Sequence, residues 1–193
     1  MKSLKEILYK VEIINVVGTT DLPISSVHFD SRKVKKQSLF VSVKGTITDG
    51  HEYISQAIKN GATAIVAEQL PSETEKNISY IIVKNSSKAL AVIATNYFEN
   101  PSEKLKLIGV TGTNGKTTIV SLFFNLFLGM NKKVGMLSTI NNKINNDTIE
   151  STHTTADAVE INQLLSQMVS DGCEYCFMEV SSHAIDQNRI VGL

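Results

Sequence analysis

No excess of charge of either sign marks this sequence, because lysine and arginine together number 19 and aspartate and glutamate also number 19. A balanced chain has no overall field that draws it to nucleic acid or to an anionic membrane, so neither partner is expected. Any anion that the chain binds must therefore be held by local geometry.

Long hydrophobic runs are also lacking. No stretch reaches the roughly 18 apolar residues that a membrane-spanning helix needs, and the most apolar window, residues 121–130, is too short. The amino terminus mixes charged and apolar residues, so it lacks the uninterrupted apolar region of a signal peptide. We therefore expect a cytoplasmic protein.

Cysteine is scarce, with only Cys173 and Cys176 in a Cys-x-x-Cys arrangement. This spacing suits a redox pair or half of a zinc site, but no second pair of cysteines or histidines stands at ligand spacing. Cys176 lies within the apolar run of residues 173–180, which is typical of a buried strand. We expect two reduced thiols with a structural role.

Hydrophobic residues make up 42% of the chain, which is enough to build a core. Residues 1–100 alternate short apolar runs with turns, as a small α/β domain would. The Asn-Pro-Ser-Glu stretch at residues 100–103 breaks this pattern, because proline disfavours helix at the residue before it, and we place a domain boundary there. In the first domain we expect strands at residues 38–43, 62–67 and 79–83 and helices at residues 51–60 and 86–98.

Residues 101–193 alternate strand and helix patterns, which implies parallel strands joined by right-handed crossovers. The first strand is a largely apolar run bounded by charge and glycine, and it is expected to be buried on both faces. Three such strands fall short of the usual doubly wound sheet, so we expect an incomplete domain, with residues 141–147 as an exposed hairpin or loop. The expected strands are residues 105–110, 134–138 and 175–180, and the expected helices are residues 116–128 and 156–169. The predicted fold class is therefore α/β, a small N-terminal α/β domain followed by a truncated parallel-sheet domain.

A glycine-containing turn joins the first of these strands to its helix and predicts a phosphate-binding loop. In it, Lys116 would face the outer phosphates, and the Thr117 hydroxyl would bind Mg²⁺. The strict pattern requires glycine at position 110, where this chain has Val110, so a chance Gly-Lys-Thr at a helix start is the alternative. The candidate ATP-binding residues are Gly112, Thr113, Asn114, Gly115, Lys116, Thr117 and Thr118.

The run Thr-Gly-Thr-Asn-Gly-Lys-Thr-Thr at residues 111–118 resembles the phosphate loop of the Mur ligases, which add amino acids to UDP-N-acetylmuramoyl peptides. That family uses this variant of the motif, so Val110 is no obstacle. Folylpolyglutamate synthases and cyanophycin synthetase have similar loops, so the loop alone does not choose among these ligases.

A second stretch resembles the branch of the family that adds the third residue of the peptide. It consists of Val-His-Phe-Asp-Ser-Arg at residues 27–32 and Gly-Thr-Ile-Thr-Asp-Gly at residues 45–50. The resemblance implies that the uridine diphosphate end of the substrate contacts Ser31, Arg32, Thr46 and Thr48. Without the resemblance, a surface turn with a solvated salt bridge would be the simpler interpretation.

Two further stretches resemble the same branch. One is Thr-His-Thr-Thr-Ala-Asp at residues 152–157, where the threonines either cap a helix or, by the resemblance, contact the sugar–peptide part of the substrate. The other is residues 177–189, where the resemblance makes Glu179 a Mg²⁺ ligand and leaves His183 ambiguous. The candidate substrate-binding residues in these stretches are His153, Thr154, Thr155, Ser181, Gln187 and Arg189.

The resemblance implies an ATP-dependent ligase acting on UDP-N-acetylmuramoyl-L-alanyl-D-glutamate in peptidoglycan synthesis. The substrate carboxylate would attack the γ-phosphate of ATP, and the amine of diaminopimelate or lysine would then displace phosphate from the acyl phosphate. Lys116 and Glu179 are the candidate catalytic residues, with Thr117 and Glu179 holding Mg²⁺. The family's carbamylated lysine and its C-terminal domain would lie beyond Leu193, so these residues alone are not expected to ligate. The alternatives are another Mur-type amide ligase and a P-loop module that binds nucleotide without ligating.

Overall fold

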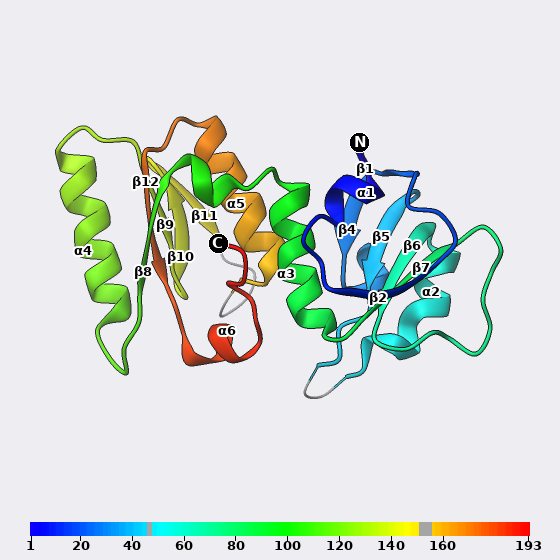
Figure 1. Ribbon diagram of the computed structural model, residues 1–193. Coiled ribbons are helices and arrows are strands. Elements are labelled where there is room, and N and C mark those ends of the chain that lie inside the picture. Colours follow the sequence, from blue (N-terminus) through cyan, green and yellow to red (C-terminus); the bar gives the residue numbers. More distant parts are fainter. Residues whose placement is uncertain (46–47, 151–155) are drawn as a thin grey trace. The chain divides into compact units, whose positions relative to one another are not determined.

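The computed structural model describes residues 1–45, 48–150 and 156–193, which form two compact units, Met1–Tyr97 and Phe98–Leu193 (Figure 1). The stretch where the boundary was expected forms the short 3-10 helix η3 (Pro101–Lys104) at the start of the second unit. Asn100 precedes it with a left-handed backbone, at φ 49°.

The first unit is built on a five-stranded sheet in the order β2-β7-β6-β5-β4. Strand β2 runs antiparallel to β7, and the other neighbours are parallel. Strands β1 and β3 pair antiparallel and form a separate two-stranded sheet. The strands are β1 (Lys2–Ser3), β2 (Ile13–Val17), β3 (Pro23–Ile24), β4 (Ser26–His28), β5 (Ser38–Val41), β6 (Ala62–Ala67) and β7 (Ser79–Val83).

The central strands of this sheet are buried because helices cover both of its faces. On one face, Phe40, Ile65 and Tyr80 pack with Ile54 and Ala57 of helix α2. Figure 1 shows helix α3 on the opposite side of the sheet. The helical segments are α1 (Leu4–Ile7), η1 (Ser31–Lys33), η2 (Gly50–Tyr53), α2 (Ile54–Lys59) and α3 (Ser86–Tyr97).

The helix expected at residues 51–60 begins as a 3-10 turn and becomes α-helical only at Ile54. The Asp49 side chain accounts for the turn, because its Oδ1 accepts a hydrogen bond from the His51 backbone N–H at 2.9 Å. Gly61 follows the helix with φ +110°, the conformation expected at this position. The strand expected at residues 38–43 ends at Val41.

The second unit has a five-stranded sheet in the order β11-β10-β9-β12-β8. Its strands β9, β12 and β8 are parallel, as expected, and the hairpin β10–β11 extends the sheet in antiparallel fashion. The sheet is therefore mixed. The strands are β8 (Lys106–Val110), β9 (Val134–Leu137), β10 (Asn141–Ile144), β11 (Asp147–Glu150) and β12 (Tyr175–Glu179), and the helices are α4 (Lys116–Gly129), α5 (Ala158–Ser170) and α6 (Ser182–Asp186).

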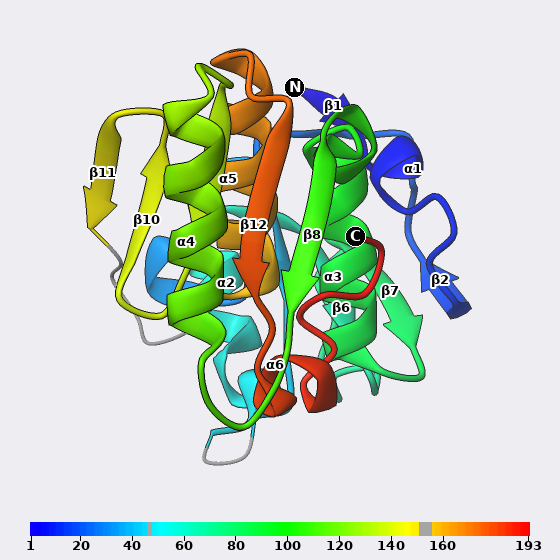
Figure 2. The ribbon, with the colours of Figure 1, turned by 90° about the vertical axis from the view of Figure 1, so that its left-hand side faces the viewer.

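Helices α4 and α5 cover opposite faces of this sheet (Figures 1 and 2). Strand β12 shows the alternation that this requires. Phe177 packs with Val120 and Phe124 of α4, whereas Cys176 and Met178 pack in the cluster that includes the apolar side of α5. Helix α5 begins two residues later than expected, since the carboxylate of Asp157 caps it by accepting hydrogen bonds from the backbone N–H groups of Val159 and Glu160, both at 2.9 Å.

One expectation for this unit is wrong. Strand β8 is not buried on both faces, because Lys106 and Gly109 are exposed and the other three residues are half-buried. In the described part of the chain β8 is the edge strand and pairs with β12 alone. Helix α4 likewise exposes apolar side chains, with Leu122 63% and Leu126 56% exposed.

Both cysteines are free and buried. Burial raises the pKa of the Cys176 thiol far above its usual value and also raises the pKa of Cys173. Among the residues described, no group of three histidine, cysteine or acidic side chains is arranged to hold a metal ion. The burial of both thiols fits a structural role. None of the described helices is long and apolar enough to cross a membrane.

Candidate functional site

The predicted phosphate loop connects the end of β8 to the first turn of α4. Gly115 is the residue before the helix and has φ +81°, a conformation that costs L-residues with a side chain roughly 1–2 kcal/mol. A Cβ atom at Gly115 would meet no other atom within 4 Å. Glycine is therefore needed here for its backbone, and the space above the helix N-terminus is left open.

Lys116 opens helix α4. Its ammonium group donates a hydrogen bond to the carbonyl oxygen of Gly112 at 2.7 Å, so the side chain folds back over the loop. The unpaired backbone N–H groups of the first helical turn and the partial positive charge of the helix N-terminus lie beside this cation. The combination favours binding of a phosphate.

The loop borders a cavity of about 710 Å³. All of the residues lining it belong to the second unit, and they come from the loop and the first turn of α4, from the segment after β9, and from the end of β12 and the segment that follows it. The carboxyl ends of parallel strands are where ligands bind in open α/β sheets. The lining residues are Thr113, Asn114, Gly115, Lys116, Thr117, Thr139, Glu179, Ser181, His183, Gln187 and Arg189.

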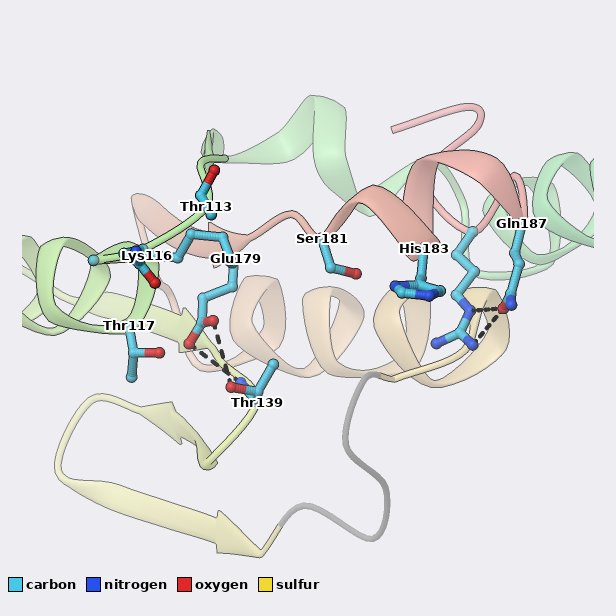
Figure 3. A pocket seen from close by; sticks show the side chains of 11 residues that line it. Thr113, Lys116, Thr117, Thr139, Glu179, Ser181, His183 and Gln187 are labelled. Atoms are coloured by element: carbon cyan, nitrogen blue, oxygen red, sulfur yellow. Dashed lines mark hydrogen bonds between the residues drawn. The ribbon is translucent and has the colours of Figure 1, made fainter.

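Glu179 is the last residue of β12 and is only 8% exposed. Its carboxylate accepts hydrogen bonds from the Thr139 backbone N–H at 3.3 Å and from the Thr139 hydroxyl at 3.4 Å (Figure 3). No motif in the sequence marks Thr139, because its place beside Glu179 follows from the pairing of β9 with β12.

The donor set at this end of the cavity fits a magnesium ion. Figure 3 shows the Thr117 hydroxyl and the Glu179 carboxylate facing the same space. Both are oxygen donors, and Mg²⁺ is usually held by one or two such protein ligands together with phosphate oxygens and water. Thr117 and Glu179 are therefore the residues that would hold the metal.

The other side of the cavity carries the residues that follow β12. The Ser181 hydroxyl accepts a hydrogen bond from the Ala184 backbone N–H at 3.1 Å and so caps α6. Gln187 Oε1 accepts hydrogen bonds from Arg189 Nε at 2.9 Å and from Arg189 Nη2 at 2.5 Å, which orients the guanidinium group. His183, whose role the sequence left ambiguous, lines the same cavity.

Two of the candidate loop residues do not line the cavity. Gly112 contributes the carbonyl that receives Lys116, and Thr118 is exposed on the first turn of α4. The candidates His153, Thr154 and Thr155 lie outside the described residues.

The remaining candidates belong to the first unit. The Asp30 carboxylate accepts three hydrogen bonds from the Arg32 side chain, from Nε to Oδ1 at 2.9 Å, from Nε to Oδ2 at 3.3 Å and from Nη2 to Oδ2 at 2.8 Å. It also accepts one from the Arg32 backbone N–H at 3.0 Å. The side-chain hydrogen bond from Arg32 holds the pKa of Asp30 below its usual value. The Arg32 side chain is 87% exposed, so this ion pair is solvated, as the simpler interpretation of the turn expects.

Ser31 is buried, and its backbone carbonyl accepts a hydrogen bond from Asn60 Nδ2 at 2.8 Å. Thr48 is exposed, and its carbonyl accepts a hydrogen bond from Gly45 N–H at 3.0 Å, which closes the loop between Lys44 and Asp49. Thr46 lies outside the described residues.

His51 anchors this loop, a role that no sequence pattern predicted. Its Nδ1 lies 2.6 Å from Asp49 Oδ1, and its Nε2 lies 2.9 Å from the backbone nitrogen of Glu68, which donates to it. With Nε2 accepting, the ring proton is on Nδ1 and points at Asp49. The imidazole thus ties the end of the loop to the end of β6.

Two family profiles match the chain. The profile described as "Mur ligase family, catalytic domain" matches residues 23–99, and the one described as "Mur ligase middle domain" matches residues 110–193. The chain belongs to the Mur ligase family. Among similar Mur ligases, the UDP-N-acetylmuramoyl-L-alanyl-D-glutamate–2,6-diaminopimelate ligases of Cytophaga hutchinsonii and Bacteroides fragilis are 51% and 48% identical to it. Each match covers 98% of this chain but only 39% of the relative's length.

Solved Mur ligase structures share the fold. A structure of a UDP-N-acetylmuramoyl-L-alanyl-D-glutamate–2,6-diaminopimelate ligase matches the whole chain with a TM-score of 0.80 at 25% identity, and the match covers 38% of that protein. The MurF ligase of Thermotoga maritima in complex with ADP matches 81% of the chain with a TM-score of 0.53 at 26% identity, over 32% of its own length.

Proposed function

We propose that this chain is the substrate- and ATP-binding part of the ligase that adds the third amino acid to UDP-N-acetylmuramoyl-L-alanyl-D-glutamate. The observation that carries the proposal is the cavity in which the loop residues Lys116 and Thr117 face Glu179, with Arg189 lining the other side of the same cavity. The relatives, named as ligases of this substrate and diaminopimelate, support it.

The chemistry explains why these residues share one cavity. A substrate carboxylate and the γ-phosphate of ATP repel each other, so the site must neutralise negative charge before an acyl phosphate can form. Lys116 and the N-terminus of α4 supply fixed positive charge for this purpose. A Mg²⁺ ion on Thr117 and Glu179 would add Lewis-acid polarisation of the phosphoryl oxygens. No nucleophilic side chain is needed, because the substrate carboxylate is the nucleophile.

The residues on the other side of the cavity are assigned to the substrate. Arg189, oriented by Gln187, offers a fork of donors that suits a carboxylate. Ser181 presents a hydroxyl to the cavity. We assign the sugar–peptide part of the substrate to these residues and to His153, Thr154 and Thr155, and the nucleotide diphosphate end to Ser31, Arg32, Thr46 and Thr48 of the first unit. The remaining loop residues, Gly112, Thr113, Asn114, Gly115 and Thr118, are assigned to ATP.

The incoming amine in this proposal is diaminopimelate, which is supported by the names of the relatives. The reaction would take place in the cytoplasm, where ATP is available.

Calorimetric titration of the chain with UDP-N-acetylmuramoyl-L-alanyl-D-glutamate, and separately with Mg-ATP, tests the proposal. We expect both to bind, and we expect Arg189→Ala to weaken the UDP substrate without changing ATP affinity. Glu174→Ala, an exposed carboxylate paired with Lys132, serves as the control and should change neither. If the chain binds Mg-ATP but does not bind the UDP substrate, the proposal is contradicted and a nucleotide-binding module that does not ligate is favoured. Binding of folate-type substrates instead would favour a different amide ligase.

A further inference from the structure

The carboxylate of Glu179 needs hydrogen-bond partners, because it is 8% exposed at the end of a strand that lies between two others. Within the described part of the chain, Thr139 donates both of the hydrogen bonds that this carboxylate accepts. One comes from the backbone and one from the hydroxyl, and they reach different oxygens of the carboxylate. A single residue therefore holds the carboxylate at two points.

The chain brings Thr139 to this place through a turn centred on Ser138. The hydroxyl of Ser138 donates to the Asn141 carbonyl at 2.6 Å and accepts from the backbone N–H groups of Ile140 and Asn141 at 3.3 and 3.1 Å. Met178 of β12 pairs with Leu137 of β9. Thr139 comes shortly after Leu137 in the chain and therefore lies level with the end of β12. The turn frees the Thr139 N–H from the sheet and directs it to Glu179.

We infer that Thr139 is a positioning residue that orients the Glu179 carboxylate toward Thr117 for the divalent cation bound with the nucleotide. The inference rests on the proposed function, in which Thr117 and Glu179 hold that cation. With Thr139 occupying one side of both oxygens, their remaining lone pairs face the cavity, where Figure 3 shows the Thr117 hydroxyl. The carboxylate is then oriented before the metal arrives, so less ordering is needed on binding.

Loss of partners that orient metal ligands typically costs roughly 10–100-fold in metal affinity. The hydrogen bonds here are long, at 3.3 and 3.4 Å, and the backbone donor survives any side-chain substitution. We therefore expect the lower end of this range, about tenfold, for Thr139→Val, which keeps the shape of the side chain and removes its hydroxyl.

The test measures the dissociation constant of Mn²⁺, a paramagnetic substitute for Mg²⁺, by electron paramagnetic resonance in the presence of a non-hydrolysable ATP analogue. Thr139→Val should weaken Mn²⁺ about tenfold, and Thr139→Ser, which restores a hydroxyl, should return the affinity to within about twofold of the unmodified chain. Thr148→Val, at an exposed threonine on β11, is the matched control and should leave it unchanged. Binding of the analogue in EDTA should be the same in all four proteins.

The outcomes separate the inference from the proposed function. If Glu179→Gln weakens Mn²⁺ but Thr139→Val does not, the positioning role of Thr139 is wrong while the metal site stands. If Glu179→Gln has no effect either, or the unmodified chain binds no Mn²⁺ with the analogue, both are overturned. If Thr139→Val also weakens the analogue in EDTA, Thr139 contacts the nucleotide directly and the inference is wrong.

Discussion

The ammonium nitrogen of Lys116 lies 2.7 Å from the carbonyl oxygen of Gly112, so the cation of the phosphate loop is held by the loop itself. A bound triphosphate would compete for this ammonium group with a full negative charge, which attracts the cation more strongly than a neutral carbonyl oxygen does. The geometry thus keeps Lys116 over the loop without a ligand and leaves it available to phosphate.

Replacing Lys116 with alanine in a ligation-competent form of the protein should reduce turnover by at least about 100-fold, as expected when one preorganised stabiliser of transition-state charge is lost. The fold should be unaffected, because the side chain only covers its own loop. The measurement is amino-acid-dependent phosphate release at saturating Mg-ATP. Lys132→Ala, which removes an exposed ion pair with Glu174, is the control. Near-normal turnover of the Lys116 variant would contradict its assignment to the triphosphate.

Gly115 and Gly129 stand at the two ends of α4 and should respond oppositely to alanine. Gly115→Ala should destabilise the chain by about 1–2 kcal/mol, because φ is +81° there. Gly129→Ala should be neutral or stabilising by up to about 1 kcal/mol, because Gly129 lies in the helix and an added Cβ would meet nothing within 4 Å. Urea denaturation followed by circular dichroism measures both. Equal effects at the two positions would mean that backbone strain at Gly115 does not shape the loop.

The parts that sequence patterns predicted are those set by local composition. Strands β6 (Ala62–Ala67) and β7 (Ser79–Val83) have the predicted bounds, because both are apolar runs ended by turn residues and buried by helices on both faces. The apolar residues of β8 also predicted burial on both faces. The burial of a strand depends on its neighbours in the sheet, and among the described residues β8 has a neighbouring strand on one side only. Sequence patterns do not specify which strands become neighbours.

The same limit applies to the site. Lys116 and Thr117 were predicted from the loop motif and Glu179 from the family resemblance, and the three line one cavity. Thr139 and His51 were missed because their roles depend on contacts between distant segments, Thr139 with Glu179 at the end of β12 and His51 with Glu68 just after β6. A threonine after a strand and a histidine in a loop carry no signal until the register of the sheet is known.

His51 should affect the UDP substrate and leave ATP unaffected. His51→Ala removes the link between Asp49 and the Glu68 backbone, so the loop at residues 44–49 loses an anchor. We expect a several-fold higher KM for the UDP substrate with an unchanged KM for ATP. Glu52→Ala, an exposed neighbour, is the control. An unchanged KM for both substrates would mean that the loop does not need this anchor or does not contact the substrate.

His28 should make the stability of the first unit depend on pH. Burial lowers its pKa first, the positive charges of Lys35 and Lys33 lower it further, and Asp30 opposes them. Because the folded pKa is below the unfolded value of about 6.5, the unfolded state takes up a proton first as the pH falls. The contribution of neutral His28 is therefore complete above about pH 6.5 and declines as the pH falls toward the folded pKa.

His28→Gln should remove this part of the pH dependence. The melting temperature of the unmodified chain, followed by circular dichroism, should fall between pH 7.5 and pH 5.5, and that of the variant should fall less. Asp30 does not confuse the result, because its pKa is lowered and its contribution is lost only as the pH falls below about 4. Lys35→Gln should reduce the pH dependence in the same direction, because it removes a positive charge that disfavours protonation of His28. If His28→Gln leaves the slope unchanged, protonation of this histidine is not coupled to folding.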